Sequence, residues 1–237
     1  MLDVAGGLFV AGYLGSILLA ILGRARQARI TGTTTILLLL WLVAEISVAS
    51  TAPLIGVWLP ANILMFALTF TLLSAAWVHS PALRRAAAGI PLDSLLALHA
   101  WRLGGFFFLL LYAEGRLPWP FAPVAAIGDI LTGAGAALLA LSLAHGRPVS
   151  KQAVGLWNAF GSVDLLLAIA LAIMSTPGAP FQLFIEVPAQ SAFASLPWLL
   201  VPAGVVPALM FVHLAIALRL RGERTSIANN HLSGVAL

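Results

Sequence analysis

The chain contains no cysteine and very little charge. The absence of cysteine excludes disulfides, iron–sulfur clusters, thiolate zinc sites and cysteine nucleophiles. Charged residues make up 8% of the 237 positions and hydrophobic residues 61%, whereas a soluble domain carries roughly 25% charged residues. A surface so poor in charge would not stay in water, so the sequence predicts one membrane domain whose main partner is the lipid bilayer.

Lysine and the common catalytic motifs are also scarce. The only lysine, Lys151, lies between two apolar stretches, whereas a retinal Schiff base would need a lysine within the last stretch. No HExxH metal motif, phosphate-binding P-loop or GxSG-like serine protease element occurs. The sequence therefore predicts no metal site and favours a role that is not enzymatic.

Apolar stretches long enough to cross a bilayer, about 20 residues each, recur along the chain. They predict an all-α, polytopic transmembrane bundle of about seven helices. The transmembrane domain covers 1–224, with spans at about 6–23, 33–50, 60–78, 92–112, 121–144, 153–174 and 196–218. Residues 177–195 are predicted to form an external amphipathic segment, either a surface helix or a lid, and residues 225–237 a flexible cytoplasmic tail.

The positive residues set the expected orientation. Ten of the twelve lysines and arginines follow the first, third, fifth and seventh spans. The positive-inside rule places such clusters in the cytoplasm, so we expect the N-terminus outside and the C-terminus in the cytoplasm. The net charge of +4 therefore does not indicate nucleic acid as a partner, because the basic residues occupy short loops between apolar spans.

A set of ionisable and amide side chains lies inside the predicted spans, where a charge costs roughly 2.5–3.5 kcal/mol on insertion scales. Such groups must face the bundle interior, where they pair with one another or line a wet cavity. We therefore expect one polar core made of Glu45, His99, Arg102, Asp129, Asn158, Asp164 and His213.

Arg102 is the cation deep within this set, and arginine keeps its proton in proteins. Its depth in the membrane matches Asp164 best, with Asp129 and Glu45 next. Three interior acids then face one permanent cation, so at least one acid is expected to hold a proton or to be balanced by another cation. A buried Arg–Asp pair that only joins two helices is the alternative interpretation.

Small residues and prolines predict how the helices pack. Gly128, Gly133 and Gly135 share one span, and small residues at such spacing let helices approach closely. Pro202 and Pro207 in the last span predict a kink.

One cofactor interpretation stays open. His99 and His213 have similar depth on different helices, which is the minimum requirement for bis-histidine ligation of haem b. No second matched pair of histidines is evident, so no cofactor is predicted and haem is kept as an alternative.

A combination of residues from Arg102 onward resembles a family of bacterial multi-pass membrane proteins with no assigned activity. The resemblance covers a little over half of the chain and implies a bacterial inner (plasma) membrane. The matching residues are Arg102, Gly105, Leu117, Pro118, Phe121, Ala122, Gly128, Asp129, Trp157, Asn158, Gly161, Asp164, Pro202 and His213.

The sequence favours a small-molecule or ion transporter or channel-like protein, with proton coupling as a further expectation. Substrate or protons would bind at Arg102, Asp129, Asn158, Asp164, His213 and Glu45. An intramembrane haem redox protein and a non-catalytic subunit of a larger membrane complex are the alternatives. The substrate is left open, as is association with further copies of the chain or with another membrane protein.

Overall fold

The computed structural model describes residues 1–27, 43, 47, 61–177, 181–184 and 191–234. Within these residues the regular structure is entirely helical, as predicted. The helices are α1 Leu2–Gln27, α3 Ala61–His79, α4 Pro81–Ala88, α5 Leu92–Ala100, α6 Phe106–Ala113, α7 Phe121–Ala144, α8 Lys151–Met174 and α9 Val206–Gly234. A 3₁₀ turn, Trp101–Gly105, joins α5 to α6, and a π-helical turn, Val201–Val205, leads into α9.

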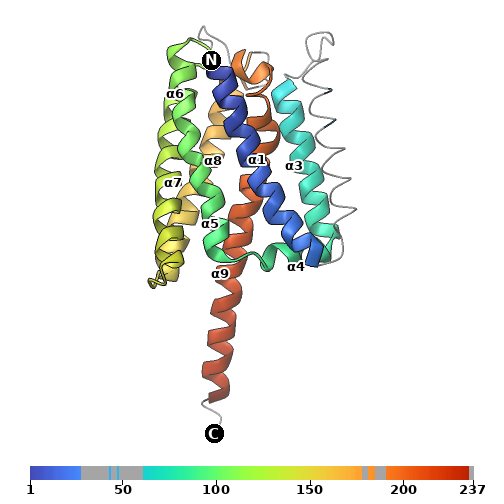
Figure 1. The fold of residues 1–237 in the computed structure, drawn as a ribbon, viewed down its shortest axis with the longest axis vertical. Helices are drawn as coiled ribbons and strands as arrows, with labels where there is room; N and C mark the ends of the chain where they lie inside the picture. The colour runs from blue at the N-terminus through green and yellow to red at the C-terminus, as the bar shows by residue number, and fades with distance from the viewer. Residues whose placement is uncertain (28–42, 44–46, 48–60, 178–180, 185–190, 235–237) are drawn as a thin grey trace.

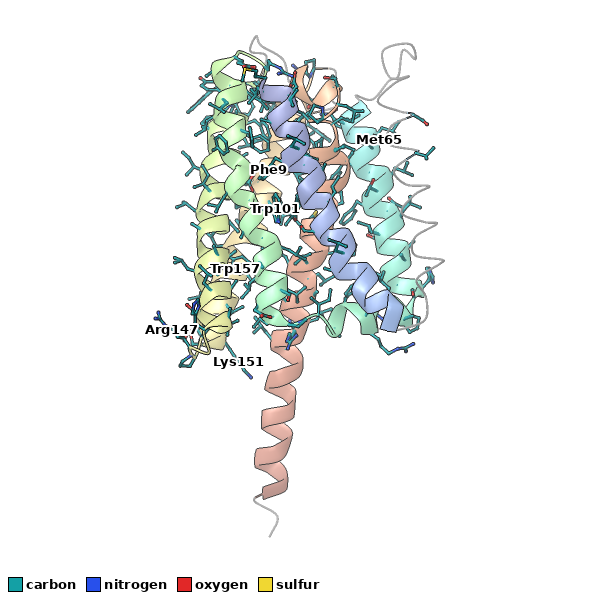
Figure 2. All side chains as sticks on the ribbon, in the orientation of Figure 1. Phe9, Met65, Trp101, Arg147, Lys151 and Trp157 are labelled. Carbon is teal, nitrogen blue, oxygen red and sulfur yellow. The ribbon has the colours of Figure 1, made fainter. Side chains whose placement is uncertain are left out.

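The long helices form one bundle, and from α3 onward successive spans run in opposite directions (Figure 1). α1, α3, α7 and α9 start from the end that holds the N-terminus, whereas α5–α6 and α8 run back toward it. α7 packs against α5, α6 and α8, and α8 packs against α9. Arg147, between α7 and α8, and Lys151, the first residue of α8, lie at the end opposite the N-terminus (Figure 2).

Five of the described helical segments are long and apolar enough to cross a membrane. They are Asn62–His79, Leu92–Ala113, Phe121–Ala144, Lys151–Met174 and Val201–Arg221, and α1 adds a shorter apolar stretch, Leu2–Ile17. Four of these ranges agree closely with the predicted spans 60–78, 92–112, 121–144 and 153–174. The predicted span 33–50 lies outside the described residues, apart from positions 43 and 47.

The bundle exposes large apolar side chains on its outer faces and buries a charged side chain in its interior. Leu138 on α7 and Val163 on α8 are 68% and 65% exposed, whereas Arg102 is 4% exposed. A soluble bundle shows the opposite arrangement, because charged side chains are almost never fully buried unless they are paired. Hydrocarbon is the solvent that suits these outer faces.

The last predicted span, 196–218, differs from the structure at both ends. Residues 196–199 form turns, and regular helix begins only at Val206, after the π-helical turn. Pro202 and Pro207 lack the N–H that a regular helix uses, which accounts for the irregular start. At the other end, α9 continues to Gly234, so residues 225–234 of the predicted tail are helical. No proline follows Pro207, so nothing interrupts the backbone hydrogen bonds there.

The predicted external segment 177–195 is described in part. Ser191–Ala194 form a 3₁₀ turn. Phe193 on this turn is buried and packs against Phe108 and Phe121 within an apolar cluster. This end of the segment therefore belongs to the packed core of the bundle.

A polar contact fixes the start of α1. Asp3 Oδ1 accepts a hydrogen bond from Trp198 Nε1 at 2.7 Å and another from Arg116 Nη1 at 2.8 Å. The Trp198 indole and the Arg116 guanidinium hold the pKa of the Asp3 carboxyl below its ordinary value, because both favour the ionised form. The contact joins the N-terminus to the α6–α7 loop and to the segment that precedes α9.

Candidate functional site

Arg102 lies on the 3₁₀ turn between α5 and α6, in the interior of the bundle. Its side chain is only 2% exposed, so its donors must find partners within the protein. Gly104 and Gly105 follow it, and the poor helix propensity of glycine favours a local departure from α-helix. From this turn the guanidinium reaches residues of α7, α8 and α9.

Two carboxylates on different helices bind the guanidinium of Arg102. Arg102 Nε donates to Asp129 Oδ1 of α7 at 2.6 Å, and Arg102 Nη2 donates to Asp164 Oδ2 of α8. Arg102 Nη1 donates to the carbonyl oxygen of Gly161 at 3.1 Å. One cation therefore holds both acids, and the α5–α6 span is tied to α7 and α8 through charge-assisted hydrogen bonds.

His213 of α9 and Asn158 of α8 extend this network. Asn158 Nδ2 donates to the carbonyl oxygen of His213 at 3.3 Å, and Asn158 Oδ1 lies 2.9 Å from His213 Nδ1. Arg102 Nη1 lies 3.3 Å from His213 Nε2. Because arginine only donates, Nε2 accepts and Nδ1 carries the proton, which assigns the neutral tautomer. His213 then brings no positive charge to offset the two carboxylates.

Glycines give the charged side chains their space. A Cβ at Gly128 would collide with the carboxylate of Asp164, and a Cβ at Gly161 would lie 2.8 Å from His213 Cε1. A Cβ at Gly105 would lie 2.5 Å from the Cβ of Asp129. The small residues that predicted close helix packing therefore also make room for the acids and the imidazole.

His99 of α5 adjoins the network without joining it. The side chain is fully buried, and neither ring nitrogen has a hydrogen-bond partner among the described residues. Its ring centre lies 4.0 Å from that of His213 and 5.2 Å from that of Trp157. Haem ligation by the two histidines would place iron and the porphyrin plane between the rings. Rings in direct contact leave no such gap, so that interpretation requires the two helices to separate.

Most of the residues expected to bind substrate or protons meet in one connected network, and Glu45 lies outside the described residues. The members that meet are Arg102, Asp129, Asn158, Asp164 and His213. Tyr13 of α1 was not predicted as a site residue, although it lines a cavity beside Arg102. Its signal in the sequence was a tyrosine well inside a span, where the hydroxyl needs a partner.

The cavity lies between the network and the helices α1 and α3. Its volume is about 120 Å³. Arg102 and Asp129 line it on the network side, and α1, α3, α8 and the π-helical turn supply a mostly apolar wall. Asp129 is thus the acid of the pair that is open to the cavity, whereas Asp164 is not among its lining residues.

Most of the chain matches one protein family. Residues 59–221 match a domain of unknown function, DUF8737. The chain belongs to the DUF8737 family. The match agrees with the expected family without an assigned activity, and it contains the whole Arg102 network, while α1 and Tyr13 precede it. No curated protein and no solved structure matches the chain.

Proposed function

We propose that the chain is a proton-coupled transporter for a small molecule or ion. It crosses the bacterial inner membrane with its N-terminus outside and its C-terminus in the cytoplasm. Arg102, Asp129 and Asp164 form its proton-binding site. The observation that carries the proposal is one buried guanidinium held between the buried carboxylate of Asp164 and the partly buried carboxylate of Asp129, which come from different helices. The apolar outer faces and the five membrane-length helices support the location.

The charge balance supports proton binding. If both acids are ionised, the site carries a net charge of −1, because Arg102 is positive and His213 is neutral. An uncompensated charge away from water costs several kcal/mol, and a proton on either acid removes it. A site of this kind is stable with one proton bound. It releases that proton when another cation binds beside the acids, or when water gains access to the ionised carboxylates. Intramembrane acids arranged in this way mark proton relays.

The two acids have different tasks in this proposal. Asp129 is 18% exposed and lines the cavity, whereas Asp164 is 8% exposed and lies against Gly128. Asp129 is therefore the acid that exchanges its proton with the cavity. Asp164 holds the guanidinium in place while the charge on Asp129 changes.

Infrared spectroscopy of the protein in lipid tests the proton directly and needs no knowledge of the substrate. We expect a carbonyl stretch from a protonated carboxyl at neutral pH. Asp129→Asn should abolish this band, and Asp93→Asn, which changes a partly exposed acid in the first turn of α5, should leave it. A wild-type spectrum without a protonated carboxyl would refute the proposal.

Proteoliposomes with an entrapped pH-sensitive dye test whether the protein moves protons across the membrane. We expect wild-type protein to admit protons under an imposed potential, since the site can pass a proton between its two sides. Asp129→Asn should stop this flux and Asp93→Asn should not. Equal flux in wild type and Asp129→Asn would show that the acid takes no part in proton movement.

A further inference from the structure

The Tyr13 hydroxyl is a polar group that the Arg102 network leaves out. Tyr13 is 2% exposed, and no group in the described part of the chain hydrogen-bonds its hydroxyl. The ring packs against Trp101, with ring centres 5.8 Å apart, and lines the cavity together with Arg102 and Asp129. A buried hydroxyl without a hydrogen-bond partner destabilises the fold. A molecule in the cavity that bonds to it would recover that free energy.

The wall of the cavity favours an apolar body. Phe9 of α1, Phe66 of α3, Ile169 of α8 and Val205 of the π-helical turn all line it. One water needs roughly 10–15 Å³ of such space, so the cavity holds on the order of ten water-sized groups. Water would find few hydrogen-bond partners along this wall, whereas a short hydrocarbon chain would fill it.

The charges at the polar end of the cavity select an uncharged head. Four of the five guanidinium N–H groups of Arg102 already have acceptors, so an anion would find at most one free arginine N–H, on Nη2, and would meet Asp129. A cation would be favoured only if Asp129 and Asp164 were both ionised. The exclusion of cations rests on the proposed function, since a proton on Asp129 leaves the site without net charge.

We infer that this cavity binds an uncharged amphipathic molecule that enters from the membrane. Its head donates a hydrogen bond to the Asp129 carboxyl and accepts one from the Tyr13 hydroxyl. Its hydrocarbon chain lies along the apolar wall between α3 and α8. The site takes lipid-soluble alcohols and related neutral amphiphiles, and it rejects fatty acids and alkylamines.

Photolabelling of the full chain in lipid nanodiscs tests this inference. Three probes share one diazirine-bearing chain and differ in the head: 1-decanol, decanoate and decylamine. We expect the alcohol to label peptides of α1, α3 and α8 that line the cavity, and excess 1-decanol to suppress the labelling. Decanoate or decylamine labelling these peptides more strongly than the alcohol would overturn the choice of head. Labels confined to the exposed faces of α7 and α8 would show simple partition into lipid and would overturn the site.

Two matched pairs of variants locate the contact. Tyr13→Phe should reduce alcohol labelling about three- to tenfold, the equivalent of one hydrogen bond. Tyr112→Phe, at the only other tyrosine, should leave it unchanged because Tyr112 does not line the cavity. Ala168→Phe should reduce labelling by the alcohol because it fills the cavity, and Leu167→Phe on the exposed face should not.

The test of the Tyr13 contact does not depend on whether the site exchanges protons. Tyr13→Phe removes only an unpaired hydroxyl, so the comparison survives even if Ala168→Phe does not fold. If the alcohol labelled Tyr13→Phe as strongly as the wild type, the inference would be overturned and the proton proposal would be unaffected. Failure of the infrared test with cavity labelling by the alcohol would refute the proton site and leave the binding site standing.

Discussion

The two sides of the bundle are packed in different ways. On the side of α5 to α8, glycines bring helices into direct contact, and a Cβ at Gly133 would lie 2.6 Å from the backbone nitrogen of Leu103. On the side of α1 and α3 the packing is uneven: a Cβ at Gly6 would lie 2.3 Å from the Trp198 ring, whereas a Cβ at Gly15 would have no described residue within 4 Å. The cavity and the unpaired Tyr13 hydroxyl also lie on that side.

This difference separates two requirements of a buried charged site. Ionised groups away from water are stable only when rigid partners hold them in good geometry, and the closely packed side supplies those partners. A ligand needs space that other side chains do not fill, and the loosely packed side supplies it. We therefore expect substitutions on the α5–α8 side to reduce stability strongly and those on the α1–α3 side to change binding.

The largest effect is expected at Arg102. Arg102→Met removes the cation and leaves Asp129 and Asp164 as unpaired buried acids. Breaking a buried pair in this way costs about 3–5 kcal/mol, so the variant should unfold at a much lower denaturant concentration in detergent. Tryptophan fluorescence during unfolding measures the loss.

Neutral replacement of the acids provides the control for that variant. Arg102→Met combined with Asp129→Asn and Asp164→Asn leaves no charge in the site and should regain much of the lost stability, though not proton flux. An Arg102→Met protein as stable as wild type would mean that the guanidinium is not the group that holds these helices together.

A smaller effect compares the two sides with one chemical change. Gly128→Ala forces a methyl group into the Asp164 carboxylate and should cost about 1–3 kcal/mol, as overpacking usually does. Gly15→Ala on α1 meets no neighbour and should be neutral or stabilising by up to about 1 kcal/mol, because alanine favours helix. Thermal unfolding of both proteins in the same detergent measures the difference. Equal losses at the two positions would show that the sides do not differ in packing.

The sequence predicted the features that depend on local pattern. Apolar length located the described spans because it is a property of each segment alone. The contacts of Arg102 with Asp129 and Asp164 followed from depth, since a lone intramembrane cation has few carboxylates within reach. The prolines predicted irregularity before α9 but not its π-helical form.

Other features depend on how distant segments pack, and pattern does not report them. The 3₁₀ turn at Arg102 forms where the α5–α6 span meets the glycines of α7. The cavity arises from side chains of many segments that lie far apart in the chain, so neither it nor the role of Tyr13 was visible in the sequence. The polarity of residues 225–234 predicted a tail, and it did not predict that these residues continue the helix α9.

The smallest effect is expected where α1 is attached to the rest of the bundle. Asp3→Asn removes the charge facing Arg116 but keeps an oxygen that accepts the Trp198 indole hydrogen bond. Because the Asp3 side chain is 53% exposed, the loss should stay within the roughly 0–1 kcal/mol typical of surface ion pairs. Asp3→Ala should cost about 1 kcal/mol more, since it leaves the buried indole N–H unpaired.

The pH dependence of this contact has a definite sign. The folded protein lowers the pKa of Asp3, so it favours the ionised form more than the unfolded chain does. The stabilisation is complete above the ordinary value of 3.8 and disappears as the pH falls through the lower pKa of the folded state. Unfolding curves of wild type and Asp3→Asn should therefore differ near neutral pH and converge in acid. A difference that persists or grows in acid would mean that the Asp3 carboxylate does not fasten α1, and the looser side of the bundle would need another attachment.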